Sequence, residues 1–149
     1  MVLPGMNGGR VPSPSSPPPI RVLLVEDSVP VRQRIRSMIE ESEAGSVVGE
    51  TGSVAAAVGL FRKHQPDVVV LDLNLMDGSG LNVLRQVKSI SPGVSVVVLT
   101  NYASPESREQ CLGLGADHYF DKSMEFERVP EVLRDMLGGE NQDAKGGCQ

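Results

Sequence analysis

The sequence predicts an α/β domain in which a mainly parallel sheet is covered by helices on both faces, a three-layer sandwich. Short runs rich in Val and Leu alternate five times with segments whose apolar residues recur at helical spacing. The runs at 20–25, 67–72 and 94–100 are apolar almost throughout, as strands buried on both faces must be. Five strands that alternate with five helices favour parallel pairing.

The first half of this pattern extends to the third strand. Residues 20–25 form the first strand, and Ser28 can cap the helix that follows. Residues 47–48 form a short second strand, and Ser53 can cap the second helix. The run 67–72 forms the third strand, so this half predicts three strands and two helices.

The second half begins with a Gly-rich loop that leads into a third helix at 81–90. Residues 94–100 form the fourth strand. Ser104 is followed by Pro and Glu, a favourable helix start because the proline needs no N–H partner and the acid faces the positive end of the helix dipole. Residues 118–121 form the last strand. The final helix should begin close to Glu127, because the proline that follows is tolerated only in the first turn.

The composition divides the chain of 149 residues into a body and two ends. Residues 1–19 are rich in Pro, Gly and Ser, which predicts a disordered tail or a proline-rich ligand for an SH3-like domain. Residues 138–149 predict a second flexible tail or a linker. The body, 20–137, is the predicted folded domain.

Charge and residue content exclude several classes of function. The 14 basic and 19 acidic residues give a net charge of −5, which argues against a general nucleic-acid binder. Residues 138–149 are too few for a DNA-binding domain after the body. No apolar run approaches the roughly 18 residues of a membrane span. Two cysteines, without a disulfide framework, favour the cytoplasm.

Polar residues gather where the predicted strands end. Glu26 and Asp27 follow the first strand, Asp72 ends the third, Thr100 ends the fourth and Lys122 follows the fifth. These ends share one edge of a parallel sheet, where ligands bind. Two carboxylates about 4 Å apart repel by roughly 4 kcal/mol at an effective dielectric constant of about 20, so the cluster calls for a cation, and oxygen ligands suit Mg²⁺. Asp72 could then act as a nucleophile toward a phosphoryl group held by Lys122 and Thr100.

Four segments carry a resemblance to a known family: VLLVEDS at 22–28, DVVVLDLNLMDGSG at 67–80, VVVLTNYA at 96–103 and GADHYFDKS at 115–123. In order and spacing, the body resembles a response-regulator receiver domain of the CheY-like, two-component type. The resemblance implies the flavodoxin-like fold, with five parallel strands in the order 2-1-3-4-5.

The resemblance also implies the roles of the acidic residues. Asp72 resembles the aspartate that accepts a phosphoryl group from a sensor histidine kinase or a phosphotransfer protein. Asp27 and Asp72, Glu26 mostly through water, and the backbone carbonyl of Asn74 resemble the Mg²⁺ ligands of the family.

Three further residues match positions that hold or transmit the phosphoryl signal. Thr100 and Lys122 resemble the pair that binds the phosphoryl oxygens. Tyr119 resembles the aromatic that turns inward with the threonine, toward an output protein on the face of the fourth helix, fifth strand and fifth helix. One departure is Ser123, which follows Lys122 where the family usually has a cis proline. The sequence leaves the isomer of this peptide open.

The predicted function is therefore a two-component response regulator, a Mg²⁺-dependent phosphoacceptor switch rather than an enzyme. One alternative is an adaptor that keeps the fold without phosphorylation. A haloacid-dehalogenase-type phosphohydrolase is less favoured, because Asn74 stands where that class has its second aspartate. A nucleotide-binding module is disfavoured because Val83 replaces the third glycine after Gly78 and Gly80. Kinase, output target, pathway, oligomeric state and whether the chain is full-length stay open.

Overall fold

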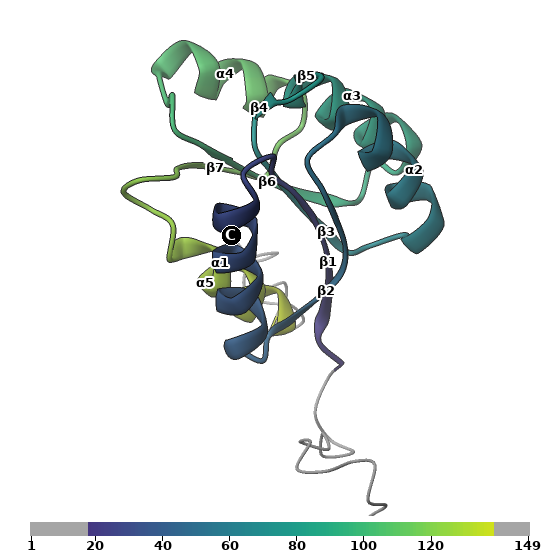
Figure 1. Cartoon of the computed structure of the whole chain (residues 1–149), viewed down its shortest axis with the longest axis vertical. Helices are drawn as coiled ribbons and strands as arrows, with labels where there is room; N and C mark the ends of the chain where they lie inside the picture. Colours follow the sequence, from purple (N-terminus) through teal and green to yellow (C-terminus); the bar gives the residue numbers. More distant parts are fainter. Residues whose placement is uncertain (1–17, 139–149) are drawn as a thin grey trace, which may run out of the picture.

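A computed structural model describes residues 18–138 of the chain (Figure 1). Its centre is a five-stranded parallel sheet in the order β2-β1-β3-β6-β7. The strands are β1 (Ile20–Val25), β2 (Gly45–Thr51), β3 (Val68–Leu71), β6 (Ser95–Thr100) and β7 (His118–Asp121). Because β4 and β5 form a separate small hairpin, this is the order 2-1-3-4-5 of the five main strands. The predicted fold class is confirmed.

Helices cover both faces of the sheet (Figure 1). Helices α1 (Val29–Glu41) and α5 (Arg128–Leu137) pack on one face, and α2 (Val54–His64), α3 (Gly80–Ile90) and α4 (Pro105–Gly113) pack on the other. Successive apolar side chains of β1, β3, β6 and β7 alternate between two apolar cores, one under each helical layer. The three central strands are therefore buried on both faces, as their apolar sequences predict.

The predicted helix starts are confirmed by their hydrogen bonds. The side chain of Ser28 accepts from the N–H of the third following residue at 3.4 Å. Ser53 and Ser104 make the corresponding bonds at 3.2 and 3.1 Å. Helix α5 follows Glu127, as expected. Each cap satisfies a backbone donor that the helix cannot pair itself.

Two local features differ from the sequence expectations. Strand β2 has seven residues rather than the predicted pair at 47–48, and a register shift between Val22 and Leu23 lets it follow β1 along its length. The loop before α3 contains a hairpin of two short strands, β4 (Asn74–Leu75) and β5 (Gly78–Ser79). Strands of two residues are too short to produce a hydrophobic period.

The predicted ends of the chain are outside this description, apart from residues 18, 19 and 138. Within 18–138, no helix has both the length and the apolar character needed to span a bilayer.

Candidate functional site

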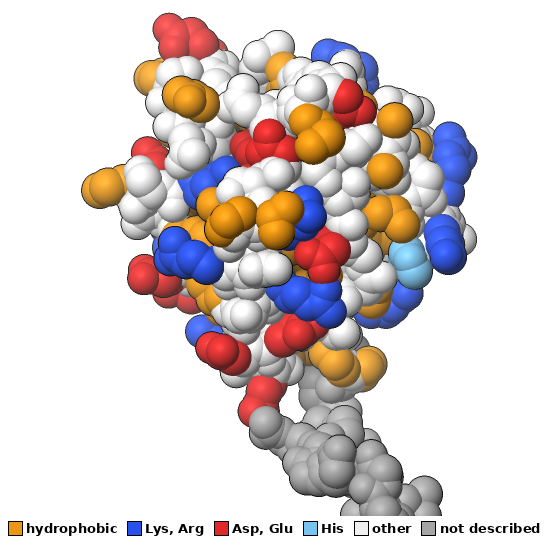
Figure 2. All heavy atoms as spheres, viewed as in Figure 1, with side chains coloured by type: hydrophobic (Ala, Val, Ile, Leu, Met, Phe, Trp, Pro, Cys, Tyr) orange, Lys and Arg blue, Asp and Glu red, His pale blue; other side chains and the backbone are white. Residues whose placement is uncertain are grey.

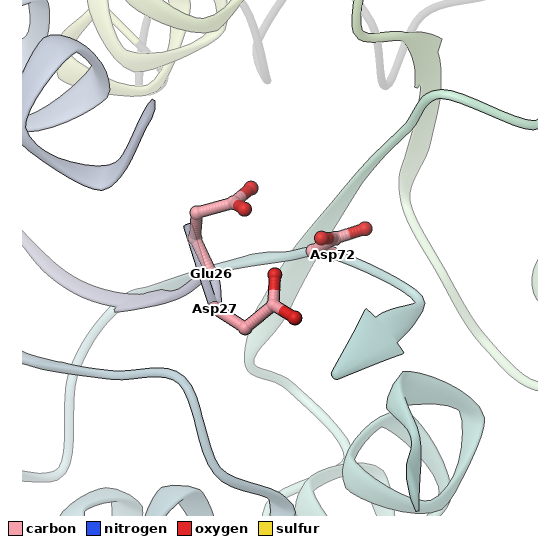
Figure 3. Close-up of side chains that lie close together, drawn as sticks. All are labelled: Glu26, Asp27 and Asp72. Atoms are coloured by element: carbon pink, nitrogen blue, oxygen red, sulfur yellow. The ribbon is translucent and has the colours of Figure 1, made fainter. Parts of the chain in front are cut away.

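Three carboxylates meet at the carboxyl edge of the sheet. Glu26 and Asp27 come directly after β1, and Asp72 comes directly after β3 (Figure 3). One oxygen from each of the three lies within 4.8 Å of the others, so the cluster can hold a metal ion. Glu26 and Asp72 are only 2% and 5% exposed, which strengthens the repulsion between them.

Lys122 supplies the nearest positive charge to this cluster. Its Nζ lies 2.7 Å from Oε1 of Glu26 and 3.2 Å from Oδ2 of Asp72. Burial alone would lower the pKa of Lys122, but the two carboxylates outweigh burial and raise it. Burial raises the pKa of Glu26, against the opposing hydrogen bonds from Lys122 and from the N–H of Ser28.

The peptide between Lys122 and Ser123 is trans, as are all the peptides of the described residues. The N–H of Lys122 donates to the carbonyl of Thr100 at 2.8 Å, which extends the pairing between β6 and β7 by one residue. This bond directs the lysine backbone along the sheet edge, and the long side chain then reaches both Glu26 and Asp72.

The start of α3 packs against the backbone of Asp72. A Cβ on Gly80 would lie 2.2 Å from the Asp72 carbonyl oxygen and 2.9 Å from the Cα of Leu73. Only glycine permits this approach, in which the N–H of Gly80 donates to the Leu73 carbonyl at 2.8 Å. The N–H of Asn74 donates to Oδ1 of Asp72 at 3.2 Å, so both polar groups of the Leu73–Asn74 peptide are paired beside the carboxylate.

Asp77 joins this same loop to the N-terminus of α2. Its carboxylate accepts from the N–H groups of Val54 at 2.6 Å and Ala55 at 3.2 Å, and from the hydroxyl of Ser53 at 2.9 Å. These bonds, that of Val54 first, lower the pKa of Asp77. The hairpin that follows Asp72 is therefore attached to a helix.

Thr100 and Tyr119 lie on the adjacent strands β6 and β7. Thr100 is fully buried, and its hydroxyl oxygen accepts from the N–H of Tyr102 at 3.1 Å. Tyr119 is buried as well, and its hydroxyl oxygen accepts from the N–H of Ser104, the cap of α4, at 3.3 Å. Among the nine residues of α4 only Cys111 is buried. The tyrosine therefore contacts a lightly packed helix.

The sequence profile of the response regulator receiver domain matches residues 22–134. The chain belongs to this family. The match covers every strand of the sheet and all five helices apart from their outermost residues. This confirms the resemblance that the four sequence segments predicted, and with it a signalling domain of two-component response regulators.

Curated relatives of this receiver domain include two proteins of Mycobacterium tuberculosis. The chain is 32% identical over 120 residues to the DNA-binding transcriptional activator DevR/DosR, covering 80% of this chain and 55% of the relative. It is 38% identical over 119 residues to the probable transcriptional regulatory protein TcrX, covering 80% and 50%. The chain thus spans about half the length of the curated relatives it matches.

A solved structure shows the same fold. The signal receiver domain of the putative response regulator NarL from Mycobacterium tuberculosis superposes with a TM-score of 0.73 at 27% identity. The superposition covers 83% of this chain and 99% of that one.

The receiver-domain structure brings together the carboxylates and the lysine that the strand ends predicted. It places Thr100 and Tyr119 on the adjacent strands β6 and β7, where Tyr119 pairs with Val98, two residues before Thr100. Asn74 lies in β4, and its N–H donates to Asp72. Sequence reasoning considered Gly80 only as part of a nucleotide-binding loop and missed its close contact with Asp72. It also missed Arg32, which is described below. Gly80 could have been found from its position eight residues after Asp72, at the start of a helix.

Proposed function

We propose that this receiver domain accepts a phosphoryl group on Asp72 from a phosphohistidine of a sensor kinase or phosphotransfer protein, and that phosphorylation switches its binding to an output protein. One observation carries the proposal. Asp72 shares a buried site with two further carboxylates and a lysine that is 3.2 Å from its Oδ2. Packing alone does not require three acids at one edge of a sheet, since each repels the others.

The donor set fits Mg²⁺. The available side-chain ligands are carboxylate oxygens, which hard divalent cations prefer, and there is no sulfur or imidazole among them. Asp27 and Asp72 would bind the cation directly, with the carbonyl of Asn74, and Glu26 would bind through water. Bound there, Mg²⁺ supplies positive charge to the oxygens of the transferring phosphoryl group.

The transfer itself is a displacement at phosphorus. One oxygen of Asp72 forms the new O–P bond while the N–P bond of the donor breaks, and the imidazole nitrogen keeps that electron pair. The ammonium of Lys122 already lies beside Asp72, and it stabilises the negative charge of the phosphoryl oxygens. The hairpin and α3 fix the backbone of Asp72, so the nucleophile is positioned in advance.

The signal leaves through Thr100 and Tyr119. A phosphoryl oxygen offers the Thr100 hydroxyl a charged acceptor, and the resulting movement reaches Tyr119 on the adjacent strand. Tyr119 contacts the cap of α4, so the face of α4, β7 and α5 changes and binds the output protein. The face drawn in Figure 2, which has α1 in the foreground, carries acidic and basic side chains close together, and such a mixed surface suits a protein partner better than a nucleic acid.

Phosphorylation by acetyl phosphate with Mg²⁺ tests the proposal. Intact-mass analysis should show one added phosphoryl group in the wild type and none in Asp72→Asn. Asp67→Asn is the matched control, because Asp67 precedes β3 at the opposite end and accepts a hydrogen bond from the N–H of Arg21. A wild-type protein that stays unmodified, with acetyl phosphate and with beryllofluoride alike, would instead favour the phosphorylation-independent adaptor.

A further inference from the structure

Arg32, in the first turns of α1, contacts the backbone of the acidic site. Its Nη1 donates to the carbonyl oxygen of Glu26 at 2.7 Å, and its Nε lies 3.3 Å from Oε1 of Glu50 on β2. The side chain is 19% exposed, so water competes only weakly for either bond. One guanidinium therefore joins a helix, a strand and the peptide that links Glu26 to Asp27.

Both peptides that flank Glu26 are held by hydrogen bonds, and Arg32 holds the second, which leads to Asp27. The N–H of Glu26 donates to the carbonyl of Thr51 at 2.9 Å, and the carbonyl of Glu26 accepts from Arg32. Gly52 completes the contact, because a Cβ there would lie 2.7 Å from the Cα of Asp27 and 3.2 Å from Nη1 of Arg32. Because the peptide is planar, the orientation of the Glu26 carbonyl fixes the position of the Asp27 backbone N–H and Cα. Arg32 therefore helps to set the direction in which the Asp27 side chain points.

We infer that Arg32, anchored by Glu50, is a positioning residue that presets Asp27 for the divalent cation. The inference rests on the proposed metal site. A planar guanidinium can donate from Nε and Nη1 in two fixed directions, whereas a lysine ammonium has no such geometry. Groups that orient metal ligands typically change metal affinity by about 10- to 100-fold when they are removed.

An electrostatic role and a positioning role of Arg32 predict opposite changes in Mg²⁺ affinity when the residue is replaced. If Arg32 acted only as a nearby cation, Arg32→Met would make the acidic site more negative and tighten Mg²⁺ binding. If Arg32 acts by fixing the Glu26–Asp27 peptide, the same substitution weakens Mg²⁺ binding. The sign of the change therefore separates the two roles.

Arg36 provides a matched control one turn further along α1. It also pairs with Glu50, but its other partner is Glu40, at 3.7 Å, rather than the Glu26 carbonyl. Arg36→Met removes the same charge and a bond to the same glutamate. It should leave Mg²⁺ affinity within about twofold of the wild type, because positioning, not charge or helix stability, sets the affinity.

The experiment is a Mg²⁺ titration of the full chain followed by ¹H–¹⁵N NMR, which also reports whether each variant is folded. We expect Arg32→Met to raise the dissociation constant about tenfold. Arg32→Lys is the second variant: it keeps the charge and should still weaken binding several-fold. Unchanged or tighter binding in both variants would overturn the inference.

Asp27→Asn separates this outcome from a failure of the proposed site. If Asp27→Asn abolishes Mg²⁺ binding while both Arg32 variants bind like the wild type, only the positioning role is wrong. If Asp27→Asn also binds like the wild type, the metal site itself is wrong.

Discussion

Asp27→Asn should stabilise the protein when no divalent cation is present. The oxygens of Asp27, Glu26 and Asp72 lie within 4.8 Å of one another, and Lys122 offsets one of the other two charges. The nearby Arg32 is paired with Glu50, so Asp27 faces a net charge of about −1. At the outer limit of 4.8 Å, the repulsion is about 0.9 kcal/mol at the dielectric constant of water and about 3.5 kcal/mol at an effective value of about 20.

The half-buried position of Asp27 lies between these limits, so we expect a gain of about 1–3 kcal/mol in the free energy of unfolding. Urea denaturation in EDTA, followed by far-UV circular dichroism, measures it. Each kcal/mol should also raise the melting temperature by about 4 °C. Asparagine has nearly the same volume as aspartate, so packing should contribute little to the difference.

Mg²⁺ should remove most or all of the stability advantage of Asp27→Asn over the wild type. At a free concentration about 100 times its dissociation constant, a ligand of the native state adds about 2.7 kcal/mol, which only the wild type should gain. Asp27→Asn that is less stable than the wild type in EDTA would refute the repulsion argument. A variant that gains as much from Mg²⁺ as the wild type would refute the role of Asp27 as a ligand.

Three other changes test the surroundings of the site. Gly80→Ala should destabilise the fold by about 2 kcal/mol or more in urea denaturation, because the new Cβ meets the Asp72 carbonyl, whereas Gly59→Ala, where nothing lies within 4 Å, should not destabilise it. Thr100→Ala should still take beryllofluoride but lose the accompanying NMR shifts in α4; equal shifts would disprove the coupling. Because the pKa of Asp77 is lower in the folded than in the unfolded state, its carboxylate stabilises the fold above the unfolded pKa, and this contribution is lost as the pH falls through the folded pKa. Thermal melts below about pH 4 should therefore show a smaller loss of stability for Asp77→Asn than for the wild type.

The sequence predicted most of the sheet because burial on both faces leaves a direct signal. Strands β1, β3 and β6 consist almost wholly of Val, Leu and Ile, and each ends abruptly at an acid or a hydroxyl. The topology of parallel strands then brought those end residues to one edge. Asp27 and Asp72 could therefore be placed together without knowledge of any contact.

Other features had no such signal. Strand β2 lies at the sheet edge, and its two adjacent valines are flanked by Gly, Ser, Glu and Thr, so only its apolar centre was visible. Arg32 escaped notice because its partner in the site is a backbone carbonyl, which any residue offers, and its anchor Glu50 is 18 positions away. Contacts of this kind depend on the packing of α1 against β2.

Under the proposed function, a count of charge shows why neutral donors must complete the switch. Three carboxylates and one ammonium give the resting site a charge of about −2. A phosphoryl group of charge about −2 replaces the single charge of Asp72, and a divalent cation leaves about −1 in a buried site. The Thr100 hydroxyl accepts from Tyr102, and its own hydrogen is free to donate to that excess charge. Such a bond is worth about 1.5–3 kcal/mol, enough to shift a two-state equilibrium about 10- to 150-fold. Helix α4 offers the least packing to oppose this shift, because Cys111 is the one buried residue among its nine.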